Sequence, residues 1–259
     1  MAYLCFSLPL ETGTLVLVNL TGKVKDTNEP LEATVEEEAK ALGIYDPSRR
    51  YEPRLISVGE GWVIPGIDEA LKQASVGEKI SIDIPPEKAF GHRDAAKIKL
   101  IPLRKFGEKA REISVGDEVE YEGRVGVVRF VGSGRVQVDF NHRLAGKVLT
   151  YTIEVIKKLE DPMEKVLYLT KRWINVDEKK IIITIEDKTV KIQLPEETYL
   201  FEGLQISKRG ISKDIFKYLP EVEKVLFIEE YRSEKKKEEK PQEAKAPEKL
   251  EEQGKKEVK

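Results

Sequence analysis

The sequence of 259 residues contains one cysteine, Cys5, and only two histidines, His92 and His142. A single cysteine rules out an intramolecular disulfide and is typical of proteins from a reducing compartment. Two histidines that stand far apart in the chain give no spacing of transition-metal ligands. We therefore expect a cytoplasmic protein that binds no metal and uses no other cofactor.

The chain also lacks long apolar runs and an excess of one charge. It has 45 Lys and Arg against 47 Asp and Glu. The two signs are mixed along the sequence, so the basic face of a nucleic-acid-binding protein is missing. Apolar runs such as Thr14–Leu20 are too short to span a bilayer, and the N-terminus has no signal-peptide pattern. We expect neither nucleic acid nor membrane among the partners.

The common signatures of covalent and phosphate chemistry are missing as well. No Gly-rich phosphate loop and no G-x-S-x-G turn occurs in the sequence. Cys5 precedes the first expected strand, which is an unfavourable place for a nucleophile. A function that needs only a shaped apolar surface remains open.

The first part of the chain reads as strands alternating with two short helices. Strands are expected over 14–24, 54–58 and 79–84, where β-branched or alternating apolar residues lie between turn residues. One helix is expected over 34–43, with Thr34 as its cap, Glu37 completing a capping box and Gly43 ending it. A second helix is expected over 67–74.

The pattern changes between residues 92 and 139. A basic, irregular stretch is expected over 92–106. Short strands follow near 118–121, 125–131 and 135–139, and Gly123 and Gly132–Gly134 supply the turns between them. Residues 150–160 then return to the alternation of the first part. We therefore expect one domain interrupted by a small β domain.

Asp161-Pro162 marks a second boundary. A helix over 163–174, strands over 180–186 and 189–194, a helix over 211–218 and a strand over 224–231 predict a small α+β domain. Residues 233–259 are dominated by Lys, Glu, Pro, Gln and Ala. Such a segment buries too little apolar surface to offset its ordering entropy, so we expect a disordered tail.

Several motifs in order carry a family resemblance. "VIPGIDEAL" at Val63–Leu71 is followed by "SVGE" before a strand and by "PEKAFG" ending at Gly91. The segment 138–160, "VDFNHRLAGKVLTYTIEVIKKLE", adds an N-H-x-L-A-G turn. Together these resemble the FKBP family of peptidyl-prolyl cis/trans isomerases, in its SlyD-like branch, which carries a domain inserted in the flap. The added C-terminal domain resembles the long archaeal members.

The resemblance implies an α+β fold and a discontinuous isomerase domain. The expected architecture is an FKBP-like antiparallel half-barrel sheet with a short helix, formed by residues 1–91 and 140–160. The inserted small β domain takes residues 92–139, and a C-terminal α+β domain takes 161–232. The partners implied are unfolded or nascent polypeptides that contain proline; the sequence does not give the oligomeric state.

The resemblance also implies site residues. The catalytic group consists of Ile64, whose backbone amide would anchor the peptide, with Phe90, Tyr151 and Glu32. Residues expected to contact the substrate are Leu20, Leu31, Val63 and Ile67. Taken singly, each apolar residue is better explained by core packing, whereas the whole set in this order favours a pocket. The insert is expected to offer a chaperone surface at Tyr121, Val127 and Phe130, although these too could be core.

Departures from the family pattern leave two alternatives open. Leu20 and Leu31 stand where relatives carry aromatic rings, Phe90 replaces the usual Tyr, and Arg54 stands where an aromatic is common. We expect reduced but measurable isomerase activity. The alternatives are a non-enzymatic holdase on an FKBP scaffold and a dedicated partner-binding scaffold. His142 is expected to hydrogen-bond within its turn, and Trp62 and Trp173 are expected to be packing residues rather than parts of a ligand cage.

Overall fold

The computed structural model describes residues 10–231 and contains three antiparallel or mixed sheets. The first is formed by β1 (Leu15–Val24), β2 (Pro30–Ala33), β3 (Arg54–Ser57), β4 (Lys79–Ile84) and β9 (Leu149–Lys158). Its order is β2-β1-β9-β4, and β3 pairs with the first half of β1. The expected α+β class and antiparallel sheet are confirmed.

Alternation along β1 and β9 sends one face of this sheet into a core. Helix α2 (Pro65–Gln73) covers that face and buries Ile67 and Leu71 against it. Gly66 allows this close approach, because a Cβ there would lie 2.4 Å from the Ile84 side chain. Helix α2 is therefore held firmly against β4, which fixes the position of its first turn.

The short helix α1 (Glu36–Ala41) begins differently from the prediction. Its cap position is Val35, which makes no side-chain capping bond. The hydroxyl of Thr34 instead accepts a 2.8 Å hydrogen bond from the Leu20 amide, because Thr34 is buried where β2 leaves β1. The expected capping box is therefore wrong. Gly43, at φ 71°, does follow the end of the helix as predicted.

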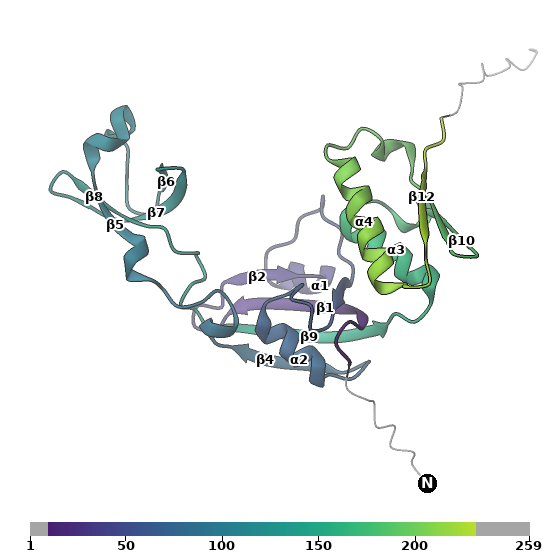
Figure 1. The fold of residues 1–259 in the computed structure, drawn as a ribbon. Helices are drawn as coiled ribbons and strands as arrows, with labels where there is room; N and C mark the ends of the chain where they lie inside the picture. Colours follow the sequence, from purple (N-terminus) through teal and green to yellow (C-terminus); the bar gives the residue numbers. More distant parts are fainter. Residues whose placement is uncertain (1–9, 232–259) are drawn as a thin grey trace, which may run out of the picture.

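The second sheet has the order β5-β8-β7-β6 and lies within the segment 92–139 (Figure 1, left). It contains β5 (Ile98–Pro102), β6 (Glu118–Tyr121), β7 (Arg124–Gly132) and β8 (Arg135–Asp139), with short 3-10 turns at Ala95–Lys97 and Leu103–Arg111. Strand β5 lies in the stretch expected to be irregular; its pairing with β8 orders it. The tight turns at Gly123 and Gly134 have positive φ, as their predicted role requires.

The third sheet, β10-β11-β12, lies at the other end of the molecule with two helices packed on it (Figure 1, right). Its strands are β10 (Ile182–Glu186), β11 (Thr189–Gln193) and β12 (Lys224–Ile228), and its helices are α3 (Pro162–Trp173) and α4 (Leu204–Tyr218). The order α-β-β-α-β agrees with the prediction. Helix α4 begins seven residues earlier than expected.

Gly210 explains why the start of α4 is hard to read from sequence. It lies inside the helix, where glycine is normally unfavourable. A Cβ at this position would lie 2.4 Å from the ring of Trp173. The glycine therefore lets α3 and α4 pack closely, and tertiary contact outweighs its low helix propensity. Trp173 packs between the helices, as predicted.

The C-terminal part shares a buried core with the first sheet. Leu15 and Leu17 of β1 and Leu55 of β3 belong to the same apolar cluster as Val166, Leu169 and Ile211. The two parts of the chain are thus joined by buried side chains, although the sequence suggested a boundary at Asp161. Asp161 itself caps α3 by accepting a bond from the Glu164 amide.

The three sheets lie within the three ranges expected from the sequence. Whether each range folds as a separate domain stays a prediction; for reference they are called the isomerase domain, the insert and the C-terminal domain. The proposed tail at 233–259 and Cys5 lie outside the described residues. No helix in the described part of the chain is long and apolar enough to cross a membrane.

Candidate active site

A cavity of about 350 Å³ opens beside the start of α2 in the isomerase domain. Six of the eight predicted pocket residues line it: Glu32, Val63, Ile64, Ile67, Phe90 and Tyr151. Arg54 and Trp62 complete the lining. Segments from β2, β3, α2, β9 and the loop after β4 therefore meet at one place, as the family resemblance implied.

The floor of the cavity is apolar and rigid. Ile67, in the first turn of α2, and Tyr151, on β9, are both almost fully buried. Tyr151 pairs with Gly22 across the sheet, and a Cβ at Gly22 would lie 2.6 Å from the tyrosine ring. The glycine therefore gives the ring the space to lie against β1.

Ile64 occupies the cap position of α2 with an extended backbone, φ −60° and ψ 147°. Its carbonyl accepts bonds from the amides of Ile67 and Asp68. Its own amide donates to no acceptor within residues 10–231. A backbone donor at the edge of an apolar cavity is well placed to bind a peptide carbonyl, because it gains a partner there.

The loop that carries Val63 and Ile64 is held by a carboxylate that sequence reasoning missed. Asp68 is buried and accepts hydrogen bonds from the amides of Gly59, at 2.7 Å, and Gly61, at 3.2 Å. Both glycines have positive φ, at 75° and 68°. Asp68 is the acidic residue of the "IDEAL" motif. Its place seven to nine residues after the turn glycines was the sequence signal that could have indicated this role.

One wall of the cavity is polar. The hydroxyl of Tyr151 donates to Glu32 Oε1 at 3.0 Å, and Arg54 forms an ion pair of 2.5 Å with Glu32 Oε2. Burial, together with the Glu32 carboxylate, raises the pKa of Tyr151 well above its usual range. The phenol therefore stays protonated at neutral pH and remains a donor to Glu32.

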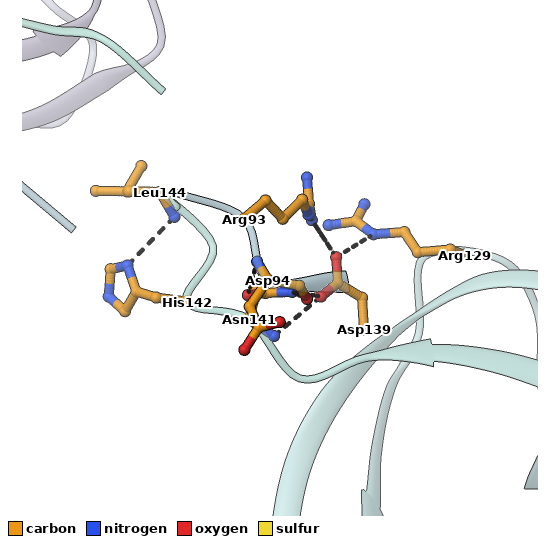
Figure 2. Close-up of polar contacts among 7 residues, drawn as sticks. All are labelled: Arg93, Asp94, Arg129, Asp139, Asn141, His142 and Leu144. Carbon is orange, nitrogen blue, oxygen red and sulfur yellow. Dashed lines mark hydrogen bonds and ion pairs between the residues drawn. The ribbon is translucent and has the colours of Figure 1, made fainter. Parts of the chain in front are cut away.

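Phe90 forms the wall nearest the insert. Its ring stacks on the imidazole of His142, with centroids 4.2 Å apart and planes 10° from parallel. His142 Nδ1 accepts a 3.3 Å bond from the Leu144 amide, as Figure 2 shows, so the predicted local hydrogen bond is present. The stacked pair was not predicted, because the two residues are far apart in sequence.

Two predicted substrate contacts need correction. Leu20 is fully buried in the core beside Ile67 and Tyr151, so no surface remains for a substrate. Leu31 is partly buried against the same core and does not line the cavity. Both residues support the site from within the protein, because their strands turn these side chains toward the sheet core.

Arg54 and Trp62 are the lining residues that sequence reasoning did not assign to the site. Trp62 packs as predicted: its ring meets Tyr218 edge-on at 5.8 Å, and the Arg172 guanidinium lies 3.8 Å from its centroid. It also lines the cavity. The C-terminal domain thus supports one wall of the site.

Comparison with known proteins agrees with this geometry. A family model described as FKBP-type peptidyl-prolyl cis-trans isomerase matches residues 9–156, more than half of the chain. The chain belongs to this family. A second model, described as FKBP26_C-terminal, matches residues 162–232. The predicted enzyme class, a peptidyl-prolyl cis/trans isomerase of FKBP type, is confirmed.

Individual relatives of this FKBP-type chain are also named as peptidyl-prolyl cis-trans isomerases. The short-type peptidyl-prolyl cis-trans isomerase of Methanocaldococcus jannaschii is 40% identical over 139 residues, covering 54% of this chain and 85% of that protein. A probable FKBP-type 16 kDa isomerase of Pseudomonas fluorescens is 35% identical, covering 40% and 71%. SlyD of Helicobacter pylori is 28% identical, covering 52% and 76%. The resemblance to SlyD-like and archaeal members is therefore confirmed.

Two linkers join the FKBP-type domain to its insert, and a polar cluster connects them (Figure 2). Arg93 and Arg129 form ion pairs with the buried carboxylate of Asp139. Asn141 donates to Asp139 and to the Asp94 carbonyl, and accepts from the Asp94 amide at 2.9 Å. Burial opposes ionisation of Asp139, but the bonds from Asn141 and Arg93 lower its pKa overall.

The insert of this FKBP-type chain has one covered and one open sheet face. Val128, Val136 and Val138 are buried on the covered face. The register places Leu100 and Phe130 on either side of Gln137 on the open face, and they are 52% and 55% exposed. Val125 and the half-buried Val127 lie on the same open face.

Tyr121 is the exception among the predicted chaperone residues. It packs with the core side of the insert, 6.0 Å from the Phe106 ring, and is half-buried. The alternation of β6 turns it to the covered face, so its assignment to the open surface is corrected. Val127 and Phe130 remain on the open face.

The described residues offer no cluster of three or more His, Cys, Asp or Glu side chains that could hold a metal ion. The groups that line the site are its apolar walls, the segment of Ile64 and the Glu32 network.

Proposed function

We propose that this protein isomerises X-Pro bonds in unfolded or partly folded chains, within the cavity lined by Ile67, Phe90 and Tyr151. Rotation about the X-Pro bond must break amide resonance, with a barrier of about 18–20 kcal/mol. The planar amide is more charge-separated than the twisted one. An apolar site therefore favours the twisted state relative to the planar state, and no proton transfer is needed.

The observation that carries the proposal is the Ile64 amide, which has no acceptor within residues 10–231 and lies beside an apolar floor. This donor can hold a carbonyl of the bound peptide, which orients the chain while the prolyl ring rests on Ile67 and Tyr151. We propose that activity is reduced relative to family members that carry Tyr at the position of Phe90, because Phe90 supplies no hydroxyl to the cavity.

Turnover of a proline tetrapeptide by matched variants tests the catalytic proposal. Ile67→Ala removes the floor, and loss of a buried aliphatic contact of about 1.5–3 kcal/mol predicts a fall in kcat/KM of about tenfold or more. Leu71→Ala is the control, because Leu71 is fully buried in the same helix but does not line the cavity. It should lower stability similarly and leave turnover of the folded enzyme nearly unchanged.

We further propose that the open face of the insert holds client chains near this cavity. Leu100, Val125 and Phe130 present an exposed apolar surface on a sheet, and such patches commonly mark interaction sites. Holding a chain there raises its local concentration at the isomerase pocket. The clients are proline-containing polypeptides in the cytoplasm.

The chaperone proposal requires a different measurement. Val125→Glu with Phe130→Glu should weaken suppression of aggregation of a denatured client and leave tetrapeptide turnover unchanged. Val76→Glu is the control, because Val76 is 47% exposed but belongs to the isomerase domain. Equal losses of aggregation suppression and of tetrapeptide turnover would contradict separate roles for the insert and the isomerase cavity. Suppression of aggregation without any tetrapeptide turnover would instead identify a non-enzymatic holdase.

A further inference from the structure

A second cavity of about 350 Å³ lies between the isomerase domain and the C-terminal domain. Five cationic side chains line it, with one carboxylate, Glu52, among them. The cations are Arg49, Arg50, Arg54, Lys171 and Arg172. The aromatic rings of Trp62 and Tyr168 also line this cavity.

Two of these cations are available to a ligand. Arg54, Lys171 and Arg172 already form ion pairs with protein carboxylates. Arg49 and Arg50 are exposed, and within residues 10–231 no carboxylate lies within ion-pairing distance of either one. Asp46 and Asp177 interact with them electrostatically only at longer range. Within the described residues, the guanidinium groups of Arg49 and Arg50 are therefore open to direct pairing with a further carboxylate.

This cavity adjoins the isomerase pocket. Arg54 and Trp62 line both cavities, so the two cavities are neighbours on either side of these side chains. The wall between them is fixed, because the Arg172 guanidinium lies 3.8 Å from the Trp62 ring centroid and the two domains share a buried core. The positively charged cavity thus lies next to the site where the prolyl bond would lie.

A larger neighbouring cavity of about 630 Å³ shares Arg49, Arg50, Lys171 and Glu52 with this one and adds Lys179, Glu36, Asp177 and Glu178. The lining of the cavity that borders the isomerase pocket therefore has more cations than carboxylates, whereas the lining of the larger one has equal numbers. An electrostatic preference should therefore act on side chains close to the proline and fade for those farther along the chain.

We propose that this cationic cavity binds the client segment flanking the proline and favours acidic side chains there. The inference rests on the proposed isomerase function and names the substrate class that the enzyme prefers. Carboxylates of the client pair with Arg49 and Arg50, which form no ion pair of their own within the described part of the chain. Lys171 and Arg172 of the C-terminal domain line the same cavity, where their own ion pairs hold them.

The test compares proline tetrapeptides that differ only in a three-residue extension. Glu, Gln or Lys is added on the N-terminal side in one set and on the C-terminal side in another. The extension that reaches the cationic cavity lies on one side of the proline, so the effect is expected in one of the two sets. In that set, at low salt, the Glu peptide should have a kcat/KM roughly three- to tenfold above that of the Gln peptide, and the Lys peptide should have the lowest value. Added salt should reduce the difference, because the two arginines are exposed.

The double variant Arg49→Glu/Arg50→Glu should remove or invert this preference and leave the unextended tetrapeptide unchanged. Arg209→Glu/Lys213→Glu is the control, because it changes net charge equally at exposed positions of α4 that line neither cavity. It should retain the preference for Glu.

Two results would overturn the inference: equal kcat/KM for Glu and Gln peptides in both sets, or a preference that survives in the Arg49/Arg50 variant. Turnover of the unextended peptide in either case would leave the isomerase function standing. If no peptide is turned over at all, the proposed function fails, and this inference fails with it.

Discussion

The hydroxyl of Tyr151 donates a 3.0 Å hydrogen bond to Glu32, whose other carboxylate oxygen is paired with Arg54. The pair lies at the boundary between the apolar floor and the cationic cavity, because Arg54 lines both. This geometry separates two contributions of Tyr151, its ring and its hydroxyl.

Tyr151→Phe should keep the ring and remove only the hydrogen bond. The free energy of unfolding should fall by about 1 kcal/mol, and kcat/KM for a tetrapeptide should change less than about threefold, because the apolar wall remains. Tyr199→Phe is a matched control, since Tyr199 donates to the Leu194 carbonyl in the C-terminal domain. A much larger loss of turnover in Tyr151→Phe alone would assign the hydroxyl a direct part in isomerisation.

The linker cluster around Asp139 should respond to acid. The pKa of Asp139 is lowered in the folded protein from its usual value of about 3.8. Its contribution to stability is therefore fully present above about pH 3.8 and is lost as the pH falls through the lower folded value. Hydrogen exchange of the linker amides at 92–94 and 140–142 should accelerate in that range.

Asp139→Asn should remove this pH dependence and leave the linkers less protected at neutral pH. Asp177→Asn serves as control, because the pKa of Asp177 is also lowered, chiefly by the Lys179 amide, in the C-terminal domain. Linker exchange that follows the same acid profile in wild type and Asp139→Asn would show that another group is responsible.

The shared core predicts joint unfolding of the isomerase and C-terminal domains. Leu17→Ala should lower the free energy of unfolding by about 2–5 kcal/mol, and both domains should unfold in one transition. Circular dichroism and tryptophan fluorescence can follow this, since Trp62 and Trp173 report on the two domains. Leu100→Ala, at an exposed position of the insert, should change little. Two separate transitions would contradict the joint core.

Much of the site was predictable because its residues lie in an ordered set of motifs. Val63, Ile64, Ile67, Phe90, Tyr151 and Glu32 all line the cavity. Leu20 could not be placed from sequence, because an apolar residue on a strand fits a pocket and a core equally well. Only the register of β1 with β9, which pairs Leu20 with Ile153, decides between them.

Other features depend on contacts between distant segments. Strand β5 forms because β8 supplies its partner, and α4 continues through Gly210 because Trp173 packs there. Trp62 carries no local signal for a site, and Arg54 was noted only as a departure from the family's aromatic residue. Their role follows from the position of the C-terminal domain, which the sequence placed only as a separate unit.

The stacked rings of Phe90 and His142 have a consequence for communication within the molecule. Phe90 precedes the outgoing linker of the insert, and His142 belongs to the returning one. Phe90 also lines the cavity beside α2, and the backbone of the pair is continuous with both linkers. If the insert holds client chains as proposed, a pull on the insert would act on a wall of that cavity.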